Sequence, residues 1–443
     1  MLEQINEVIS GMIVPLMLAL CGGFFSFRLN FFHILKPFTV LKGLRSSNGA
    51  SGVSSTKAVT LALAGTLGVG NIVGVSSAIY MGGIGAVFWM WVSAIVAMIL
   101  KYAEIVLAMR HRRISQDGET SGNAMNYILD FFASIKLRRL GSAVACIFAA
   151  TFLFNAFSMG SMLQSNAISE SLYGVLGIYP LFTGIGLSVI TFLGVRKGTS
   201  GIIKITNVLV PLMSAGYIVI SLAVISKNFS ELGAAFALVF SSAFSPRAAV
   251  FGTGGFAFSK AMRYGVMRGL VSNEAGCGTA PSAHALASCS SPARQGLWGI
   301  FEVFIDTLLL CTLTALCVIL EYSEAMKYAG NYMMMTVSAY SSVLGASASY
   351  FLCFAVACFG IATIICWAHY GCVCVSFFSP SATAKASFIF IYSACVFVGS
   401  LISPNTVWQL SDLAMGTMTV MNLFVITCMW KEVKAETDLL LKL

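Results

Sequence analysis

Long apolar runs separated by short polar segments recur along the whole chain. A helix needs about 20 mostly apolar residues to span a bilayer, and eleven runs meet or approach that length. The runs cover approximately residues 10–27, 57–80, 83–109, 141–170, 177–195, 205–226, 236–262, 297–320, 347–375, 386–402 and 409–430. This pattern predicts an all-α integral membrane protein with eleven transmembrane helices. The run at 236–262 is the least regular, because "FSPRAAVFGTGG" interrupts it.

Two of these runs contain glycine clusters. The second run carries "GTLGVGN" at 65–71, and the seventh carries "FGTGG" at 251–255. Glycine in a helix interior costs about 1 kcal/mol relative to alanine, so both clusters favour local unwinding. Either cluster alone would also suit close packing between helices. Together they predict two discontinuous helices, which are typical of the substrate site of a secondary transporter.

The positions of the two clusters predict an inverted repeat. After the first run is set aside, the interrupted runs are the first and sixth of ten, so the core divides into five plus five helices. Because five is odd, the second half must enter the membrane in the opposite orientation. The expected parts are a leading helix with a cytoplasmic connector at 1–56, a first five-helix repeat at 57–226, a second at 227–430 and a cytoplasmic tail at 431–443.

Composition and charge support the membrane interpretation. The chain is 58% hydrophobic and 10% charged, whereas about 25% of the residues in soluble domains are charged. With the N-terminus outside, one set of alternate loops holds almost all Lys and Arg, and the other holds only Lys227, Arg247 and Lys327. Basic residues collect in cytoplasmic loops. This asymmetry predicts a cytoplasmic C-terminus in the plasma (inner) membrane, and it explains the net charge of +9 without a nucleic-acid partner.

Several function classes lack their sequence signals. The chain has no P-loop, no G-x-S-x-G and no H-E-x-x-H, so neither an ATP-driven pump nor an enzyme is expected, and no cofactor. The four histidines are not paired with a nucleophile in the sequence. The prediction is a secondary active transporter. The alternative is a passive facilitator or channel for small polar solutes, which would need a pore lined by rings of charges or carbonyls.

The first glycine cluster offers chemistry for both a substrate and an ion. The N-terminus of a half-helix presents free N–H groups to a carboxylate, and unwound carbonyls and side-chain oxygens coordinate a hard cation. Thr66 and Asn71 supply side-chain oxygens at this point.

The chain resembles the alanine or glycine:cation symporter family over nearly its whole length. The motifs that carry the resemblance include "GTLGVGNIVGVSSAI" at 65–79, "RGLVSNEAGCGTAPSAHALAS" at 268–288 and "NTVWQLSDLAMGTMTVMNL" at 405–423. The resemblance implies one helix before a ten-helix core like that of the neurotransmitter:sodium symporters. It also implies uptake of small neutral amino acids (alanine, D-alanine or glycine) coupled to sodium, or in some members to protons.

The same resemblance implies a set of site residues. Asn71 and the carbonyl of Thr66 would bind a first sodium ion, and the carbonyls of Ala64 and Leu67 with the Thr363 hydroxyl would bind a second. This chain has Ala362 where relatives have a second hydroxyl residue, so one side-chain oxygen is lost there. The residues expected around the substrate are Thr66, Gly68, Val69, Gly70, Ser161, Gln164, Asn166, Gly254 and Phe256. For Gln164, a hydrogen bond between helices is an equally good interpretation.

Ionisable residues inside a span are costly and point to function. Asp306 lies deep in its run, where it could bind the cation, relay a proton, or hold an unwound helix through backbone N–H groups. Lys101 and Glu104 are expected near a cytoplasmic helix end, with their charges extended to the interface. Asn273 and Glu274 are expected in a cytoplasmic loop, as a gate or a helix cap.

Overall fold

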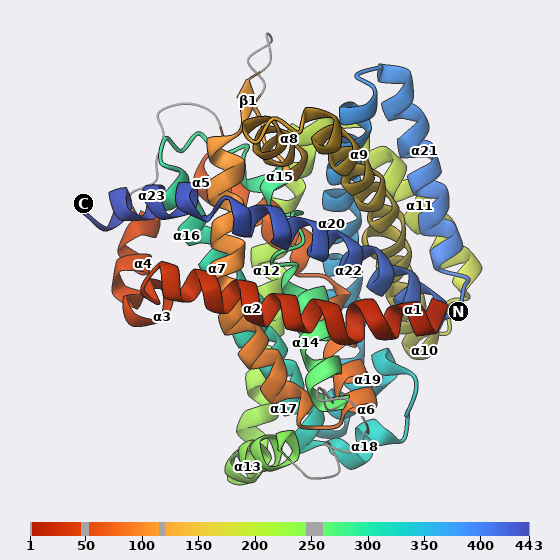
Figure 1. Ribbon diagram of the computed structural model, residues 1–443. Helices are drawn as coiled ribbons and strands as arrows, with labels where there is room; N and C mark the ends of the chain where they lie inside the picture. The colour runs from red at the N-terminus through yellow and green to blue at the C-terminus, as the bar shows by residue number, and fades with distance from the viewer. Residues whose placement is uncertain (1, 46–52, 115–119, 245–259, 443) are drawn as a thin grey trace.

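The structure, a computed structural model, describes residues 2–45, 53–114, 120–244 and 260–442 (Figure 1). Within these ranges the ordered elements are almost all helical, which confirms the all-α prediction. The strands described are β1 (Arg113–Ile114) and β2 (Thr120–Ser121), a short antiparallel pair.

The helices follow the predicted runs closely in the first half of the chain. Their bounds are α1 (Leu2–Val8), η1 (Ile9–Ile13), α2 (Val14–Arg28), α3 (Phe32–Leu35), α4 (Pro37–Arg45), α5 (Ser55–Thr66), η2 (Val69–Asn71), α6 (Val73–Gly82), α7 (Ala86–Arg110), α8 (Ala124–Ser134), α9 (Arg138–Asn155), η3 (Ala156–Leu163), α10 (Gln164–Leu176), α11 (Pro180–Val195) and α12 (Gly198–Lys227).

The second half of the chain is also helical, on both sides of residues 245–259, which lie outside the described residues. Its helices are η4 (Phe229–Glu231), α13 (Leu232–Ala243), α14 (Lys260–Asn273), α15 (Pro281–His284), α16 (Pro292–Val303), η6 (Phe304–Cys311), α17 (Thr312–Leu320), α18 (Tyr322–Met326), α19 (Tyr332–Leu344), α20 (Ala346–Phe378), α21 (Ala382–Gly399), α22 (Pro404–Cys428) and α23 (Trp430–Leu441).

Among the residues that the structure describes, eight helical segments are long and apolar enough to cross a membrane. They are Gln4–Arg28, Ala86–Arg110, Arg138–Leu176, Gly198–Lys227, Pro292–Leu320, Ala346–Phe378, Ala382–Gly399 and Pro404–Cys428. Each coincides with a predicted run, so the prediction of a membrane protein with several apolar spans is confirmed. Large apolar side chains such as Phe27, Val208 and Phe390 lie on the outside of the bundle, each about two-thirds exposed or more, as suits a surface that faces lipid.

The glycines at 65–71 interrupt a helix as predicted. Helix α5 ends at Thr66, Leu67 and Gly68 leave the helical conformation, and α6 starts at Val73 after the single turn η2. We call residues 67–72 the first interruption. Nearby, η3 and η6 are π-helical turns within longer helices, and such turns are frequent at functional sites.

Only the two ends of the seventh run fall on described residues, so its predicted interruption stays a prediction. Helix α13 ends at Ala243, and the glycines at 251–255 lie outside the described residues. The helix that packs against α6 and α7 is α14, followed by a non-helical segment at 274–280 and then by α15. We call residues 274–280 the second interruption. Hydropathy missed α14 because Lys260, Arg263 and Arg268 make it polar.

The two interrupted segments run antiparallel to one another. The end of α6 meets the start of α14, where a Cβ on Gly82 would lie 3.0 Å from the Tyr264 Cβ. At the other end, Val53 before α5 accepts a 2.8 Å hydrogen bond from the Ser288 N–H after α15. In Figure 1, α5 and α15 lie in the upper part of the molecule and α6 in the lower part.

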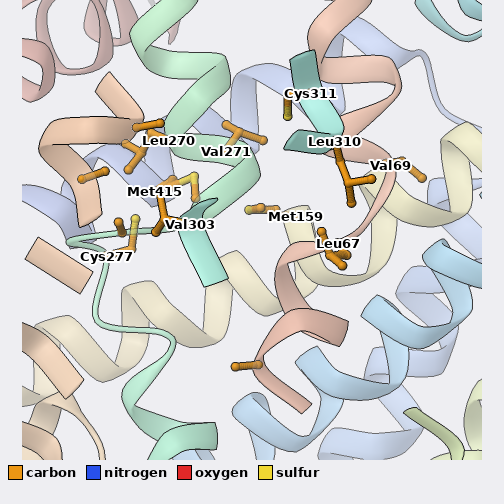
Figure 2. Close-up of a cluster of buried hydrophobic side chains, with 14 of the residues drawn as sticks. Leu67, Val69, Met159, Leu270, Val271, Cys277, Val303, Leu310, Cys311 and Met415 are labelled. Carbon is orange, nitrogen blue, oxygen red and sulfur yellow. The ribbon is translucent and has the colours of Figure 1, made fainter. Parts of the chain in front are cut away.

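Apolar side chains surround both interruptions. Figure 2 shows Leu67 and Val69 of the first interruption near Met159 and Leu310 in the buried core. The interruptions therefore lie inside the protein, where non-helical backbone at membrane depth is tolerated.

Candidate functional site

The first interruption brings the backbone of α5 and η2 against η3–α10. The Val69 N–H donates to Gln164 Oε1 at 3.0 Å, and Gln164 Nε2 donates to the Met159 carbonyl at 3.2 Å. The first N–H groups of a helix have no partner within it. The amide oxygen of Gln164 supplies one here, in the position that the oxygen of a carboxylate could take.

Helix α20 satisfies the free carbonyls at the end of α5. The Thr363 hydroxyl donates to the Ala64 carbonyl at 2.9 Å, and Trp367 Nε1 donates to the Gly65 carbonyl at 3.3 Å. The structure thus brings together Ala64 and Thr363, two of the expected ligands of the second sodium ion. Leu67, the third, is the C-cap residue that follows the end of α5 at Thr66.

Asn71 presents a buried oxygen with no partner. Its Nδ2 donates to Asp306 Oδ1 at 2.7 Å and to the Asp306 carbonyl at 3.0 Å. Because a carboxylate only accepts, these contacts fix which end of the amide is nitrogen. Among the described residues, Asn71 Oδ1 has no hydrogen-bond partner although the side chain is only 4% exposed. A buried oxygen of this kind fits a cation ligand.

Asp306 ties the two interruptions together. Besides Asn71, its carboxylate accepts from the hydroxyls of Ser272, at the end of α14, at 2.6 Å and of Thr307 at 2.8 Å. Of its three predicted roles, holding an unwound segment fits best, but the donors are side chains and not the backbone N–H groups expected. The Thr66 carbonyl accepts from the Gly68 N–H at 2.8 Å, which leaves its second lone pair for another partner.

The second interruption is held by a glutamate and an asparagine. Gly276 and Gly278 have φ values of +81° and +79°, which glycine adopts at no steric cost. The Gly278 N–H donates to Glu104 Oε2 at 3.0 Å, and Asn422 Nδ2 bridges the same oxygen, at 3.0 Å, and the Gly276 carbonyl, at 2.9 Å. Glu274, in the same segment, is 1% exposed. The expectation of a cytoplasmic loop here was wrong.

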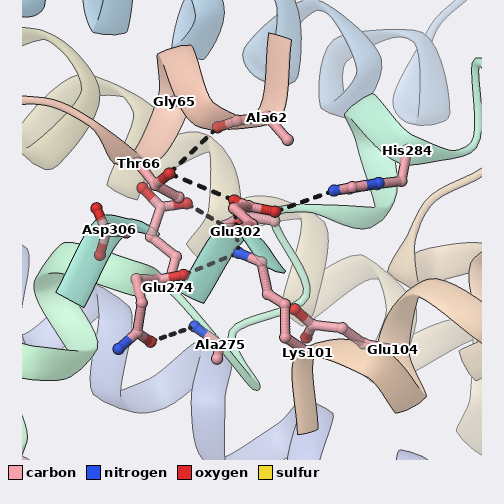
Figure 3. A network of polar contacts seen from close by, with 12 residues as sticks. Ala62, Gly65, Thr66, Lys101, Glu104, Glu274, Ala275, His284, Glu302 and Asp306 are labelled. Atoms are coloured by element: carbon pink, nitrogen blue, oxygen red, sulfur yellow. Dashed lines mark hydrogen bonds and ion pairs between the residues drawn. The ribbon is translucent and has the colours of Figure 1, made fainter. Parts of the chain in front are cut away.

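A buried lysine joins the two interruptions, as Figure 3 shows. Lys101 Nζ lies 3.2 Å from Glu302 Oε1 and donates to the Asn273 carbonyl at 2.8 Å. Glu302 also accepts from the Thr66 hydroxyl at 3.3 Å and lies 3.0 Å from His284 Nε2. Lys101 is 0% exposed, so the expectation that it reaches the interface was wrong. Its charge is compensated inside the protein instead.

These contacts follow a reciprocal pattern. The first interruption and the end of α5 before it are held by Asp306 and Glu302, which are four residues apart on α16–η6. The second interruption and the end of α14 before it are held by Glu104 and Lys101, which are three residues apart on α7. Residues at these spacings share one face of a helix. Each interruption is therefore fixed by an ionisable pair from one of two helices, α7 or α16–η6.

The expected substrate residues separate into those at the interruption and those elsewhere. Gly68, Val69 and Gln164 meet at the first interruption. Gly70 lies in η2, and Ser161 bonds the Phe157 carbonyl within η3. Asn166 faces away, since its Nδ2 donates to the carbonyls of Gly399 and Ile402 at 3.1 and 2.8 Å. Gly254 and Phe256 lie outside the described residues.

The structure adds residues that sequence reasoning missed. A narrow space without room for a water molecule lies beside the first interruption, lined by Leu67, Gly68, Asn71, Ile72, Tyr217, Leu310 and Phe359. The apolar members carry no sequence signal because any span contains such residues. In the part of the chain that the structure describes, no group of three His, Cys, Asp or Glu side chains could hold a metal ion.

Close packing at Gly68 gives a direct test of this geometry. A Cβ there would lie 2.7 Å from Gln164 Oε1 and 2.8 Å from Thr363 Oγ1, whereas at Gly74 on α6 the nearest atom would be 3.7 Å away. Overpacking of this kind costs about 1–3 kcal/mol. We expect Gly68→Ala to lower amino-acid uptake at least about tenfold at equal protein yield, with Gly74→Ala, the matched control, close to wild type. Equal uptake by the two variants would contradict the placement of Gln164 and Thr363.

Comparison with known proteins gives a consistent result. A sequence model of the sodium:alanine symporter family matches residues 1–441. The chain is 34% identical to an uncharacterized transporter, YflA, of Bacillus subtilis over 98% of this chain and 92% of that protein. It is 31% identical to the sodium/alanine symporter AgcS of Methanococcus maripaludis over 99% of this chain and 96% of that one.

The fold is also shared with a solved transporter. The substrate-bound, outward-open structure of a Na⁺-coupled sialic acid symporter superposes with a TM-score of 0.54 at 12% identity, covering 96% of this chain and 82% of that one. At this identity the likeness concerns the fold alone. The match to the family model spans nearly the whole sequence. The chain therefore belongs to the sodium:alanine symporter family.

Proposed function

We propose that the protein takes up small neutral amino acids, with alanine as the first candidate and D-alanine and glycine as further ones, in symport with sodium. The observation that carries the proposal is the first interruption. There the Val69 N–H, which a substrate carboxylate could engage, and the unpartnered oxygen of Asn71 lie within three residues of each other. A carboxylate and a cation bound side by side would stabilise one another.

Substrate binding would displace Gln164 from Val69. The carboxylate would then accept from the N–H groups of Val69 and Gly70, at the positive end of the half-helix. Leu310 and Phe359 line the narrow space next to Gly68, which favours a side chain no larger than a methyl group. Ser161 stays a proposed part of the pocket wall. For Asn166, the bonds to α21 favour a structural role.

Two sodium ions would bind on either side of the substrate. Asn71 Oδ1 and the Thr66 carbonyl would hold the first, with Asp306 acting through Asn71. The carbonyls of Ala64 and Leu67 and the Thr363 hydroxyl would hold the second, where Thr363 now bonds Ala64 directly. The missing hydroxyl at Ala362 favours weak occupancy of this second site.

The transport cycle would use alternating access in an eleven-helix topology. In this proposal α5–α6, α11 and α14–α15 cross the membrane together with the eight long spans. One leading helix then precedes two inverted five-helix repeats. The antiparallel course of the interrupted segments supports the repeat. The distribution of Lys and Arg supports an external N-terminus and a cytoplasmic tail in the plasma (inner) membrane.

Uptake by purified protein in liposomes tests this function. We expect radiolabelled L-alanine to accumulate above equilibrium under an inward sodium gradient, and the accumulation to collapse when the ionophore monensin dissipates that gradient. Competition by unlabelled D-alanine and glycine would rank the apparent affinities of the three substrates. Accumulation driven by a proton gradient without sodium would identify the proton, and not sodium, as the coupling ion. Uptake that only equilibrates would favour the passive facilitator, and no uptake of any of the three would exclude the substrate class.

A further inference from the structure

Among the described residues, no basic side chain is bonded to the buried carboxylate of Glu104 on α7. The side chain is 0% exposed. Its Oε2 accepts from the Gly278 N–H and from Asn422 Nδ2, both at 3.0 Å. Its Oε1 has no hydrogen-bond partner among the described residues. The contacts at Oε2 explain how Glu104 holds the second interruption, but they leave the other oxygen without a role.

The only cation next to Glu104 in the described structure is already engaged. Lys101, one turn earlier on α7, is bonded to Glu302 and to the Asn273 carbonyl. The other titratable groups around Glu104 are Glu302 of α16, Tyr127 of α8, and Glu274 and Cys277 of the second interruption. One ammonium therefore serves several carboxylates. An uncompensated buried carboxylate costs several kcal/mol, and protonation removes that cost.

We propose that Glu104 is a proton-binding site, occupied in this conformation and emptied during the transport cycle. A proton from water adds to Oε1 and converts the carboxylate to a neutral carboxylic acid, and release returns the proton to water. Glu104 lies six residues before Arg110, the exposed last residue of α7, which is about 9 Å along the helix axis. A small opening at that end would release the proton to one side of the membrane, after it was bound from the other side in the alternate conformation of the cycle.

A proton suits the site better than a metal ion does. The neighbours that bond Glu104 are both N–H donors, which cannot ligate a metal ion, and the nearest charge on its own helix is an ammonium. A hard metal cation needs several oxygen ligands, whereas a proton needs one oxygen. The hydrogen bonds at Oε2 can persist in both protonation states, since Oε2 accepts in each.

The proton would be linked to the amino-acid site through Lys101. An ionised Glu104 would compete with Glu302 for the ammonium. Glu302 also accepts from Thr66 at the end of α5. A shift of the Lys101 ammonium away from Glu302 would therefore alter the contact that holds the chain next to the first interruption. This inference rests on the proposed function for the identity of the transported amino acid, and it adds a proton as a second coupling ion.

Counting protons per alanine tests the proposal. Purified protein is placed in liposomes that contain a fluorescent pH indicator, with the voltage clamped by potassium and valinomycin and a fixed sodium gradient. We expect wild-type protein to move about one proton with each radiolabelled L-alanine, the count set by one titrating group. In Glu104→Gln the ratio should fall to near zero. This ratio does not depend on the rate or on the yield of protein. Glu324→Gln, which removes a carboxylate of α18 that pairs with the exposed Lys327, is the matched control and should keep the wild-type ratio.

The outcomes separate this inference from the proposed function. Sodium-driven alanine uptake without proton movement in wild type, or an unchanged ratio in Glu104→Gln, would overturn the inference and leave the proposed function standing. A second measurement needs no transport: in infrared difference spectra between neutral and alkaline solution, exposed carboxylates stay ionised, and subtracting the spectrum of Glu104→Gln from that of wild type isolates the contribution of Glu104. The subtraction should leave one carboxylic acid band, and Glu104→Asp, which serves if the glutamine variant does not fold, should shift that band. A subtraction that leaves no band would equally overturn the proton site.

Discussion

Replacing Lys101 with methionine is expected to destabilise the folded protein by about 3–5 kcal/mol, since removing one partner of a buried ion pair leaves the other charge uncompensated. The ammonium lies 3.2 Å from Glu302 with both side chains 0% exposed, and it also bonds the Asn273 carbonyl. Lys101→Met would therefore loosen both interruptions. Unfolding of the protein in detergent, followed by heat or by denaturant, measures the change.

A matched lysine on the surface controls for the substitution itself. Lys327 pairs with Glu324 at 2.6 Å, but its side chain is 62% exposed. Exposed pairs contribute about 0–1 kcal/mol, so Lys327→Met should scarcely change stability. The double variant Lys101→Met with Glu302→Gln, which removes both charges, should recover much of the loss. If Lys101→Met were as stable as Lys327→Met, the buried pair would not hold the interruptions.

Asp306→Asn is expected to lower the apparent affinity of the transporter for sodium. A hydrogen bond to a charged group contributes about 1.5–3 kcal/mol, so the sodium concentration for half-maximal alanine uptake should rise roughly 10- to 100-fold. The reason is geometric: Asp306 orients Asn71 through the 2.7 Å contact, while Ser272 and Thr307 hold the other carboxylate oxygen. An amide cannot accept at both positions.

The same substitution at an exposed aspartate provides the comparison. Asp438 pairs with Lys434 on α23, with a side chain 47% exposed, and Asp438→Asn should keep the wild-type sodium dependence. Uptake by Asp306→Asn with an unchanged sodium dependence would remove Asp306 from the sodium site.

The first interruption could be predicted from sequence because its cause is local. Glycines at 65, 68 and 70 lower the cost of unwinding within one turn, and Asn71 lies among them. The side chains that complete the site could not be predicted in the same way. Gln164 and Thr363 reach the interruption from α10 and α20, so their roles depend on how distant helices pack.

Helix α14 and the second interruption were missed because their polar residues are typical of a surface segment. Arg268, Asn273 and Glu274 are polar in sequence but at most 6% exposed. Their compensation comes from elsewhere in the chain: Arg268 pairs with Asp412 of α22 at 2.9 Å, and Asn273 bonds Lys101 and Thr307. Hydropathy scores each residue without its partners, so it assigned most of α14 to a loop.

Binding of alanine to purified protein, with and without sodium, tests the central claim that ion and substrate share the first interruption. Coupling between two sites changes affinity by roughly 5- to 150-fold, so sodium should tighten L-alanine binding by a factor in this range, and potassium at equal ionic strength should not. In Asn71→Leu, which removes the unpartnered oxygen, the factor should approach one. An alanine affinity that sodium leaves unchanged in wild type would contradict the shared site.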